Sequence, residues 1–599
     1  MVFMTSYNIM AQHDPHSFAR PEMAVVTHLS LDLRVDFETR TLQGSAYINY
    51  TAAPDAKELV LDTRGLTIKS VQSKTGQVPF RMDPSLEFLG QALRIPIQDT
   101  AGGITIQYET SPDAAALQWL NKQQTAGKNQ PFLFSQSQAI LARTWVPIQD
   151  SPGIRFTYEA TLLVPPTMLA VMSAENPTYK NESGLYHFTM RQPIPAYLLA
   201  IAVGDFEFHE LDQRSGVYAE PTMLEKSTYE FQDLPNMINA AEKIYGPYVW
   251  ERYDLIILPP SFPFGGMENP RITFATPTII AGDRSLTTLV AHELAHSWSG
   301  NLVTNATWND FWLNEGFTVY FENRIMESLY GKDFADMQRK LGQKDLLETI
   351  EELGSTNPDT RLKLQLEGRD PDDGMTDIAY EKGNNLLMLI EDYVGREKWD
   401  EFLINYFHQY SFRTITTEAF LQELKDSLFI NDSSAFETLK INEWVYQPGL
   451  PSNCKVITST KFNVVEQQAQ QWYHGTPAHQ LNTAVWSAFE WIHFLQVLPA
   501  TLTPQQLSDL DNEFHFSQSG NNEILFNWMM CCLANNQTAI YPVVEKFLNE
   551  VGRRKYVKPL FQELVKTKQG KKEAEKIFTA SKNNYHSITQ ETVRLILAQ

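Results

Sequence analysis

The chain has 599 residues, of which 43% are hydrophobic and 20% are charged, the composition of an ordinary globular protein. Its length exceeds what one hydrophobic core supports and predicts about three or four domains. The formal net charge of −22 argues against a nucleic-acid partner, because phosphate binding needs a basic face.

Cysteine usage and hydropathy indicate the compartment. The sequence contains Cys454, Cys531 and Cys532, too few and too odd a number for a disulfide framework. The stretch Met1–Asn8 lacks the basic and apolar regions of a secretion signal, and no later apolar run reaches the length of a membrane span. We therefore expect a cytoplasmic protein without a membrane partner. The sequence leaves the oligomeric state open, with a monomer slightly favoured.

The first third of the chain alternates apolar and polar residues. The alternation appears at four places: 29–37, 46–50, 104–108 and 154–160. A period of two is typical of half-buried strands. Turn residues separate these segments as far as Gly204, which predicts an all-β domain.

Near the end of this region, Phe134–Ala139 alternates amides with small residues. Gln138 within it has two interpretations of equal weight. Either its side chain projects into a neighbouring cleft, or the stretch is an exposed polar strand edge.

A buried strand is predicted at Leu255–Leu258, and it leads through two prolines to Phe264–Asn269. The paired Gly265 and Gly266 permit the close approach of another backbone. Glu268 beside them carries the charge to hold a cationic group. An ordinary Gly-Gly turn explains the glycines equally well.

The stretch Leu289–Trp298 contains an H-E-x-x-H pattern in an apolar run without proline or glycine. Residues four apart share one face of a helix, so His292 and His296 direct two imidazoles at one point, which is a zinc-ligand spacing. Glu293 is displaced around the helix but is able to reach a water held by the metal. Its position indicates a general base.

Catalytic zinc usually has three protein ligands and leaves a fourth position open. A second helical pattern begins at Trp312 and carries Glu315, which is the predicted third ligand. The turn-rich segment Gly300–Asn305 is long enough for the chain to reverse, so the two helices can lie together. For an H-E-x-x-H pattern alone, a pair of salt-bridged histidines is the alternative.

The remaining chain reads as helical. Tyr380, near the start of a further predicted helix, is by itself a core aromatic. Trp444–Ser452 contains two prolines and a glycine and predicts a linker, and amphipathic segments follow it. These patterns divide the chain into a β domain (1–205), a catalytic domain (206–447), a linker (448–455) and an all-α domain (456–599).

In sequence order, these motifs resemble the zinc aminopeptidases of the aminopeptidase N and leukotriene A4 hydrolase family, over nearly the whole chain. Gly265–Asn269 is similar to the exopeptidase motif of the family. His292–His296 and Asn314–Phe317 are similar to its zinc signature, with eighteen residues between His296 and Glu315. The resemblance implies one zinc ion per chain. It also implies an α+β multidomain fold with an N-terminal β saddle, a thermolysin-like catalytic domain and a C-terminal helical domain.

The leukotriene A4 hydrolase branch is the closer likeness, through Ser135–Ala139, Tyr446–Pro451 and Gly552–Tyr556. The resemblance implies a set of substrate-binding residues: Gln138 at the first side chain, the exopeptidase motif residues Gly265, Gly266 and Met267, and Glu268 at the free α-ammonium group.

Further roles rest on the same resemblance. It implies that Tyr380 donates its phenol to the oxyanion. Arg553 and Lys555 match positions that bind the C-terminal carboxylate of a peptide, for which a solvated basic cluster is the alternative. Glu322, seven residues after Glu315, either orients a zinc-ligand histidine or forms a surface ion pair, and it is not included in the predicted site.

The predicted function is removal of the N-terminal residue from short peptides that have a free N-terminus. One alternative adds hydrolysis of a lipid epoxide such as leukotriene A4, because Asp372 matches the acid that directs water onto the epoxide in that branch. Met375, however, stands where the branch has a tyrosine in the lipid pocket. A second alternative is a non-catalytic scaffold, which the complete set of site residues disfavours.

Overall fold

The computed structural model describes residues 13–598. The stretch Met1–Asn8, in which we expected no secretion signal, lies outside this range. Within the described range no helix combines the length and the apolar character that crossing a membrane requires.

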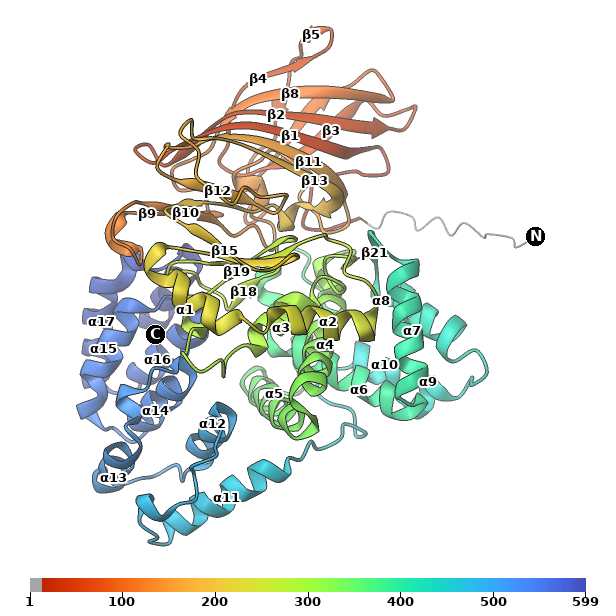
Figure 1. Cartoon of the computed structure of the whole chain (residues 1–599). Coiled ribbons are helices and arrows are strands. Elements are labelled where there is room, and N and C mark those ends of the chain that lie inside the picture. Colours follow the sequence, from red (N-terminus) through yellow and green to blue (C-terminus); the bar gives the residue numbers. More distant parts are fainter. Residues whose placement is uncertain (1–12, 599) are drawn as a thin grey trace.

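The first domain is built on a seven-stranded sheet at the top of Figure 1, in the order β13-β11-β1-β2-β8-β4-β5. Its strands alternate buried and more exposed residues, as the period of two predicted. β1 runs parallel to β11, and its pairing with β2 is antiparallel. The strands are β1 (Ala24–Asp36), β2 (Thr41–Ala52), β4 (Thr67–Ser73), β5 (Gly76–Gln77), β8 (Ala101–Glu109), β11 (Arg155–Leu163) and β13 (Leu185–Pro195).

Two smaller sheets complete this domain. One has the order β3-β7-β6, and the other has the order β12-β14-β10-β9 and lies next to the catalytic domain (Figure 1). β10 ends at Ser135, so the chain leaves it directly into the stretch that carries Gln138. The strands are β3 (Glu58–Thr63), β6 (Arg81–Met82), β7 (Gln91–Pro96), β9 (Leu117–Leu120), β10 (Phe132–Ser135), β12 (Leu169–Met172) and β14 (Ile201–Gly204).

The middle domain begins with a five-stranded sheet in the order β15-β16-β17-β19-β18. The fully buried β17 is the apolar strand predicted before the paired glycines, and it runs parallel to β16 and β19. The elements are β15 (Glu207–Asp212), β16 (Ser215–Ala219), β17 (Tyr253–Ile257), β18 (Gly266–Met267) and β19 (Ile272–Ala275), with α1 (Pro221–Phe231) and α2 (Leu234–Tyr245) between β16 and β17.

The helices that carry the zinc signature follow this sheet. α3 (Thr288–Ala295) and α4 (Trp312–Tyr330) pack against each other, joined by a reversal that includes β20 (Val303–Asn305). Tyr380 lies in a π-helical turn, Ile378–Lys382, which leads into α6. The other elements are α5 (Lys332–Leu353), α6 (Gly383–Val394), α7 (Arg396–Gln409), β21 (Arg413–Ile415), α8 (Thr417–Glu423), α9 (Ala435–Thr438) and α10 (Ile441–Tyr446).

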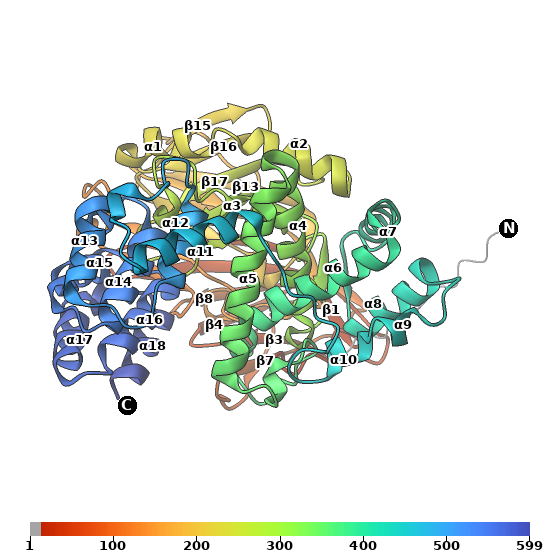
Figure 2. The ribbon, with the colours of Figure 1, turned by 90° about the horizontal axis from the view of Figure 1, so that it is seen from below.

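The last domain is all-α and has its own hydrophobic core, which extends from Val465 to Ile596. By contrast, one continuous core runs through the first two domains. α5 lies beside α11 and α12 (Figure 2), where a small cluster joins Met337, Phe462 and Phe489. The helices are α11 (Thr460–Tyr473), α12 (Ala488–Val497), α13 (Pro504–Phe514), α14 (Asn522–Ala534), α15 (Tyr541–Glu550), α16 (Arg554–Leu564), α17 (Lys568–Ser581) and α18 (Ser587–Leu597).

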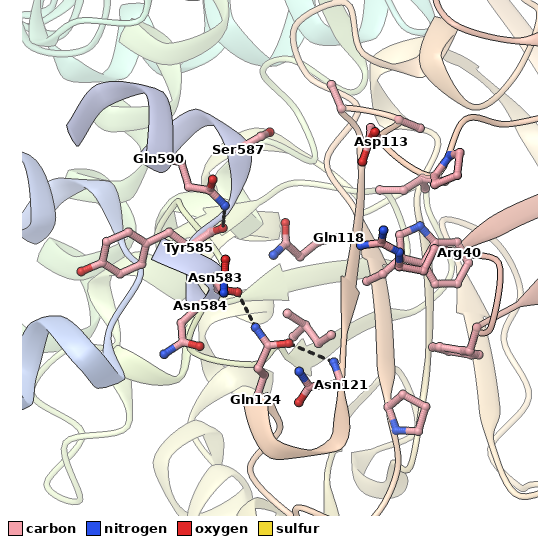
Figure 3. A pocket seen from close by; sticks show the side chains of 18 of the residues that line it. Arg40, Asp113, Gln118, Asn121, Gln124, Asn583, Asn584, Tyr585, Ser587 and Gln590 are labelled. Carbon is pink, nitrogen blue, oxygen red and sulfur yellow. Dashed lines mark hydrogen bonds between the residues drawn. The ribbon is translucent and has the colours of Figure 1, made fainter. Parts of the chain in front are cut away.

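The first and last domains also meet, around a cavity of about 800 Å³ (Figure 3). Gln124 Nε2 donates to the Asn583 carbonyl oxygen at 2.5 Å, which joins the segment after β9 to the segment before α18. None of the predicted site residues lines this cavity. The α+β multidomain fold predicted from the sequence, with its β, catalytic and helical parts in that order, is confirmed.

Candidate metal centre

The two histidines of α3 and the acid of α4 converge on one point. His292 Nε2 lies 3.3 Å from Glu315 Oε2, and His296 Nε2 lies 3.6 Å from the same oxygen. Two ligands held about 2.0–2.1 Å from a tetrahedral zinc ion lie about 3.3–3.4 Å apart. Glu315 Oε2 is buried and makes no hydrogen bond within the described part of the chain. The donor set and its spacing therefore fit a zinc ion.

The other nitrogen of each histidine ring is fixed by the protein. His292 Nδ1 lies 3.0 Å from a carboxylate oxygen of Glu322, and His296 Nδ1 lies 3.2 Å from the Ser299 carbonyl oxygen. Because these oxygens only accept, both Nδ1 atoms carry a proton, and both Nε2 atoms face Glu315, where each could bind a metal. A ligand histidine is typically oriented in this way.

Glu322, which was left out of the predicted site, contacts His292 in the structure. Its side chain is 13% exposed, so the contact with His292 is not a surface ion pair. The seven-residue spacing from Glu315 was the available signal, because it sets both acids on one face of α4.

Glu293 is buried against the backbone of the exopeptidase motif. A Cβ atom added to Gly266 would lie 2.2 Å from Glu293 Oε1, so only glycine permits this approach. Burial raises the pKa of Glu293 to about 8. An ordinary turn therefore does not fully explain the paired glycines, because Gly266 also makes space for the predicted general base.

Glu268 lies in the same cluster. Ligand atoms of Glu268, Glu293 and His296 all lie within 4.8 Å of one another. Glu268 Oε1 is buried without a hydrogen-bond partner in residues 13–598. Burial, followed by the charges of Glu315 and Glu293, raises the pKa of Glu268 well above its usual range. An added cation therefore has an unsatisfied acceptor available here.

Gln138 is 9% exposed, so the alternative of an exposed strand edge is wrong. Its segment contacts the exopeptidase motif, because Gln136 Nε2 donates to Met267 Sδ at 3.1 Å. Asp372 lies close to the backbone of Ala139, in the same segment. Burial, followed by the charge of Asp370, raises the pKa of Asp372 to about 7.

Tyr380 reaches the centre from the π-helical turn. Its ring stacks on that of His292, with centroids 6.2 Å apart and an interplanar angle of 16°. Burial, followed by the charges of Glu315 and Glu268, raises the pKa of the Tyr380 phenol well above its usual range. The hydroxyl therefore keeps its proton at neutral pH and is able to donate it.

Arg553 and Lys555 differ in their surroundings. Arg553 is buried, and a Cβ added to Gly265 would lie 2.7 Å from its Nη2, so the guanidinium packs on the exopeptidase motif. The Lys555 side chain is 53% exposed and pairs with Glu523 at 2.7 Å. A solvated basic cluster therefore does not describe Arg553. Glu523 was not singled out from the sequence, where a lone glutamate in an amphipathic helix gives no signal.

A helix with two histidines four apart, a facing helix with the third acid, and an adjacent buried glutamate define a zinc metallopeptidase. Comparison with known proteins agrees. Residues 25–198 match the peptidase M1 N-terminal domain, residues 229–444 match the peptidase family M1 domain, and residues 486–597 match the C-terminal domain of leukotriene A4 hydrolase.

Similar proteins cover nearly the whole chain. Leukotriene A-4 hydrolase from Xenopus laevis is 36% identical, over 97% of this chain and 98% of that protein. Leucine aminopeptidase 2 from Yarrowia lipolytica is 35% identical, over 97% and 93%. The structure of yeast LTA4 hydrolase in complex with bestatin superposes with a TM-score of 0.93 at 31% identity, over 99% of this chain and 98% of that one.

The chain belongs to peptidase family M1 and resembles leukotriene A4 hydrolase throughout its length. It is a zinc aminopeptidase that acts on peptides, with one catalytic zinc ion. The alternative of a non-catalytic scaffold is therefore wrong.

Proposed function

We propose that His292, His296 and Glu315 hold the zinc ion of an aminopeptidase that trims short peptides from their free N-terminus. The observation that carries this proposal is the convergence of two oriented Nε2 atoms and an unbonded carboxylate oxygen on one point. When bound, zinc acts as a Lewis acid on the scissile carbonyl and lowers the pKa of water.

Glu293 is the proposed general base and acid. Its carboxylate takes a proton from the attacking water and then passes that proton to the leaving amine. A group that alternates between the two forms needs a pKa near the working pH. Burial raises the pKa of Glu293 to about 8 in the metal-free chain, and a cation bound beside it would lower that pKa. The adjacent Gly266 lets the Glu293 carboxylate lie directly against the backbone of the exopeptidase motif.

Tyr380 is the proposed donor to the oxyanion that forms as water attacks. Its ring lies parallel to His292 and its phenol remains protonated, which suits a hydrogen-bond donor. Loss of one such donor typically costs about 10²- to 10³-fold in rate.

Glu268 is the proposed anchor for the α-ammonium group, next to Gly265, Gly266 and Met267, with Gln138 at the first side chain. The support is its buried, unpartnered oxygen beside Glu293. A buried carboxylate favours a substrate that brings a positive charge and disfavours one whose amine is blocked. This selection distinguishes an aminopeptidase from an endopeptidase.

Arg553, with Lys555, is the proposed anchor for the C-terminal carboxylate of the peptide. Arginine offers paired N–H donors to a carboxylate. Arg553 packs on Gly265, so the proposed anchors for the two ends of the peptide, Glu268 and Arg553, both lie at the exopeptidase motif. A short distance between the two anchors favours short peptides. Hydrolysis of a lipid epoxide is not part of the proposal, since Met375 lacks the phenol found at that position in the resembling branch.

The ammonium anchor is tested with aminoacyl anilides and their N-acetylated counterparts. We expect the wild-type protein to cleave the free-amine substrates alone. Removing one partner of a buried charge pair costs about 3–5 kcal/mol, so Glu268→Gln should lower kcat/KM on free amines by about 10²-fold or more. The exposed Glu397→Gln serves as the control. Cleavage of the acetylated substrates at similar rates would refute the assignment.

We also propose a cytoplasmic location. The support is that Cys454, Cys531 and Cys532 are free thiols. Fractionation of cells that express the protein tests this proposal, and recovery of the protein from outside the cytoplasm would contradict it.

A further inference from the structure

Glu523 lies in the first turn of α14, opposite the start of α16, and it contacts the residues proposed to bind the peptide carboxylate. We propose that Glu523 is a positioning residue that orients Arg553 and Lys555 toward the C-terminal carboxylate of the substrate. This inference rests on the proposed role of Arg553 and Lys555. It adds a residue from a different helix that does not touch the substrate.

Glu523 organises three side chains through one oxygen. Its Oε1 accepts from Lys555 Nζ at 2.7 Å and from the Tyr556 hydroxyl at 2.9 Å. The Tyr556 oxygen in turn accepts from Arg553 Nη1 at 3.2 Å. Because a phenol has a single proton, donation to Glu523 leaves the lone pairs of Tyr556 facing Arg553. A guanidinium only donates, so the contribution of Glu523 is to fix the orientation of the hydroxyl whose oxygen accepts from Arg553.

The charge balance of the cluster also depends on Glu523. Its side chain is 14% exposed and lies 3.9 Å from Arg553 Nη1. Among residues 13–598, no other carboxylate comes within 4.0 Å of this guanidinium. A buried arginine needs a counter-charge to remain in place. Two cations and one carboxylate leave a net charge of +1, which matches one peptide carboxylate.

Burial opposes ionisation of Glu523, but the charges of Lys555 and Arg553 outweigh it and lower its pKa. The carboxylate is therefore ionised when the substrate binds. Arg553 Nε makes no hydrogen bond within the described chain, so the guanidinium retains a free donor.

The start of α14 is attached to the catalytic domain, which fixes Glu523 relative to the metal centre. Asn521 Nδ2 donates to Ser285 Oγ at 3.0 Å, and Asn522 Nδ2 donates to the Thr278 carbonyl oxygen at 2.8 Å. Thr278 Oγ1 also accepts from Arg553 Nη1 at 3.2 Å. The same short segment thus holds both Arg553 and the helix that carries Glu523.

A positioning role and a purely structural role predict different kinetics. If Glu523 acts through Arg553 and Lys555, its loss weakens binding of substrates with a C-terminal carboxylate and leaves other substrates unaffected. If it supports only the fold, its loss changes the kinetic constants of every substrate to the same extent. Trialanine and trialanine amide differ in this one group, and both retain the free N-terminus.

The experiment measures kcat and KM on both tripeptides for wild type, Glu523→Leu and Glu523→Gln. Glu523→Leu removes the charge-assisted hydrogen bonds that orient the two cations for the substrate carboxylate. This loss of binding free energy should raise KM for trialanine by about tenfold or more. We expect KM for the amide, and kcat for both substrates, to stay within about threefold of wild type. Glu523→Gln keeps an acceptor for Tyr556 and should show a smaller increase.

Two controls separate the possible outcomes. Glu545→Leu removes a carboxylate that pairs with Lys576, an exposed lysine of the same domain, and it should match wild type. Arg553→Met should abolish the preference for the free acid. A wild type without that preference would refute the proposed role of Arg553. Two outcomes would overturn the role of Glu523 alone. In the first, the preference for the free acid is lost in Arg553→Met but kept in Glu523→Leu. In the second, Glu523→Leu raises KM equally for both tripeptides.

Discussion

At the residue scale, the metal centre depends on side chains behind the proposed ligands. Glu322 accepts from His292 Nδ1 and also from Gln338, so the carboxylate is held from two sides. His296 has a neutral acceptor, the Ser299 carbonyl oxygen, instead. Such partners fix the ring orientation and raise the basicity of the ligand nitrogen.

Replacing Glu322 by leucine should weaken zinc binding by about 10- to 100-fold, because His292 loses the acceptor that orients its ring. Competition with a chelator of known affinity measures this change. Glu348→Leu, which removes an exposed surface pair with Lys344, is the matched control and should bind zinc like the wild type. Unchanged affinity in Glu322→Leu would show that His292 is oriented without it.

The sequence predicted residues that belong to local motifs better than residues that act across helices. His292, His296 and Glu315 follow from helix periodicity and a familiar spacing. Glu523 does not, because it meets Arg553 only through the packing of α14 on α16, which no spacing along the chain encodes. Glu322 is intermediate: the spacing from Glu315 predicts which face of the helix it occupies, but not that this face is buried.

At the element scale, the contact between α4 and the π-helical turn brings Tyr380 to the centre. Gly316 follows Glu315, and Gly383 ends the turn that carries Tyr380. A Cβ added to Gly316 would lie 2.8 Å from the Cα of Gly383, and the reverse distance is also 2.8 Å. Two glycines thus let the backbones approach closely.

Gly316→Ala should force these elements apart, because the atoms that the new Cβ meets belong to the backbone. Overpacking of this kind costs about 1–3 kcal/mol in the free energy of unfolding. A small displacement of catalytic groups can also cost about 10²-fold in rate. Thermal unfolding and kcat with a tripeptide measure both effects.

The control is Gly520→Ala, where the nearest neighbour to an added Cβ lies 4.0 Å away. Wild-type activity in Gly316→Ala would contradict the account. The sequence predicted a helix from Ala379, but the π-helical turn was not foreseen, since it follows from this packing rather than from local preference.

At the scale of the whole molecule, the proposed site gathers segments from all three proposed domains. The stretch after β10 comes from the first domain, the metal helices from the second, and Arg553 from the third. We propose the division 1–205, 206–447, 448–455 and 456–599. It is supported by the pairing of β15 with the catalytic sheet and by the separate core of the last domain. The order of domains was predictable from patterning, whereas their mutual contacts were not.

The central claim is that the chain binds one zinc ion and that Glu293 acts as general base and acid in cleavage of the peptide bond. The most direct measurement is zinc content beside kcat/KM for wild type and Glu293→Gln. We predict about one zinc ion per chain in both proteins. Loss of general acid–base catalysis should lower the rate of the variant by about 10²- to 10⁴-fold. Chelation should abolish wild-type activity, and added zinc should restore it. A zinc-loaded Glu293→Gln protein that trims peptides at the wild-type rate would contradict the account.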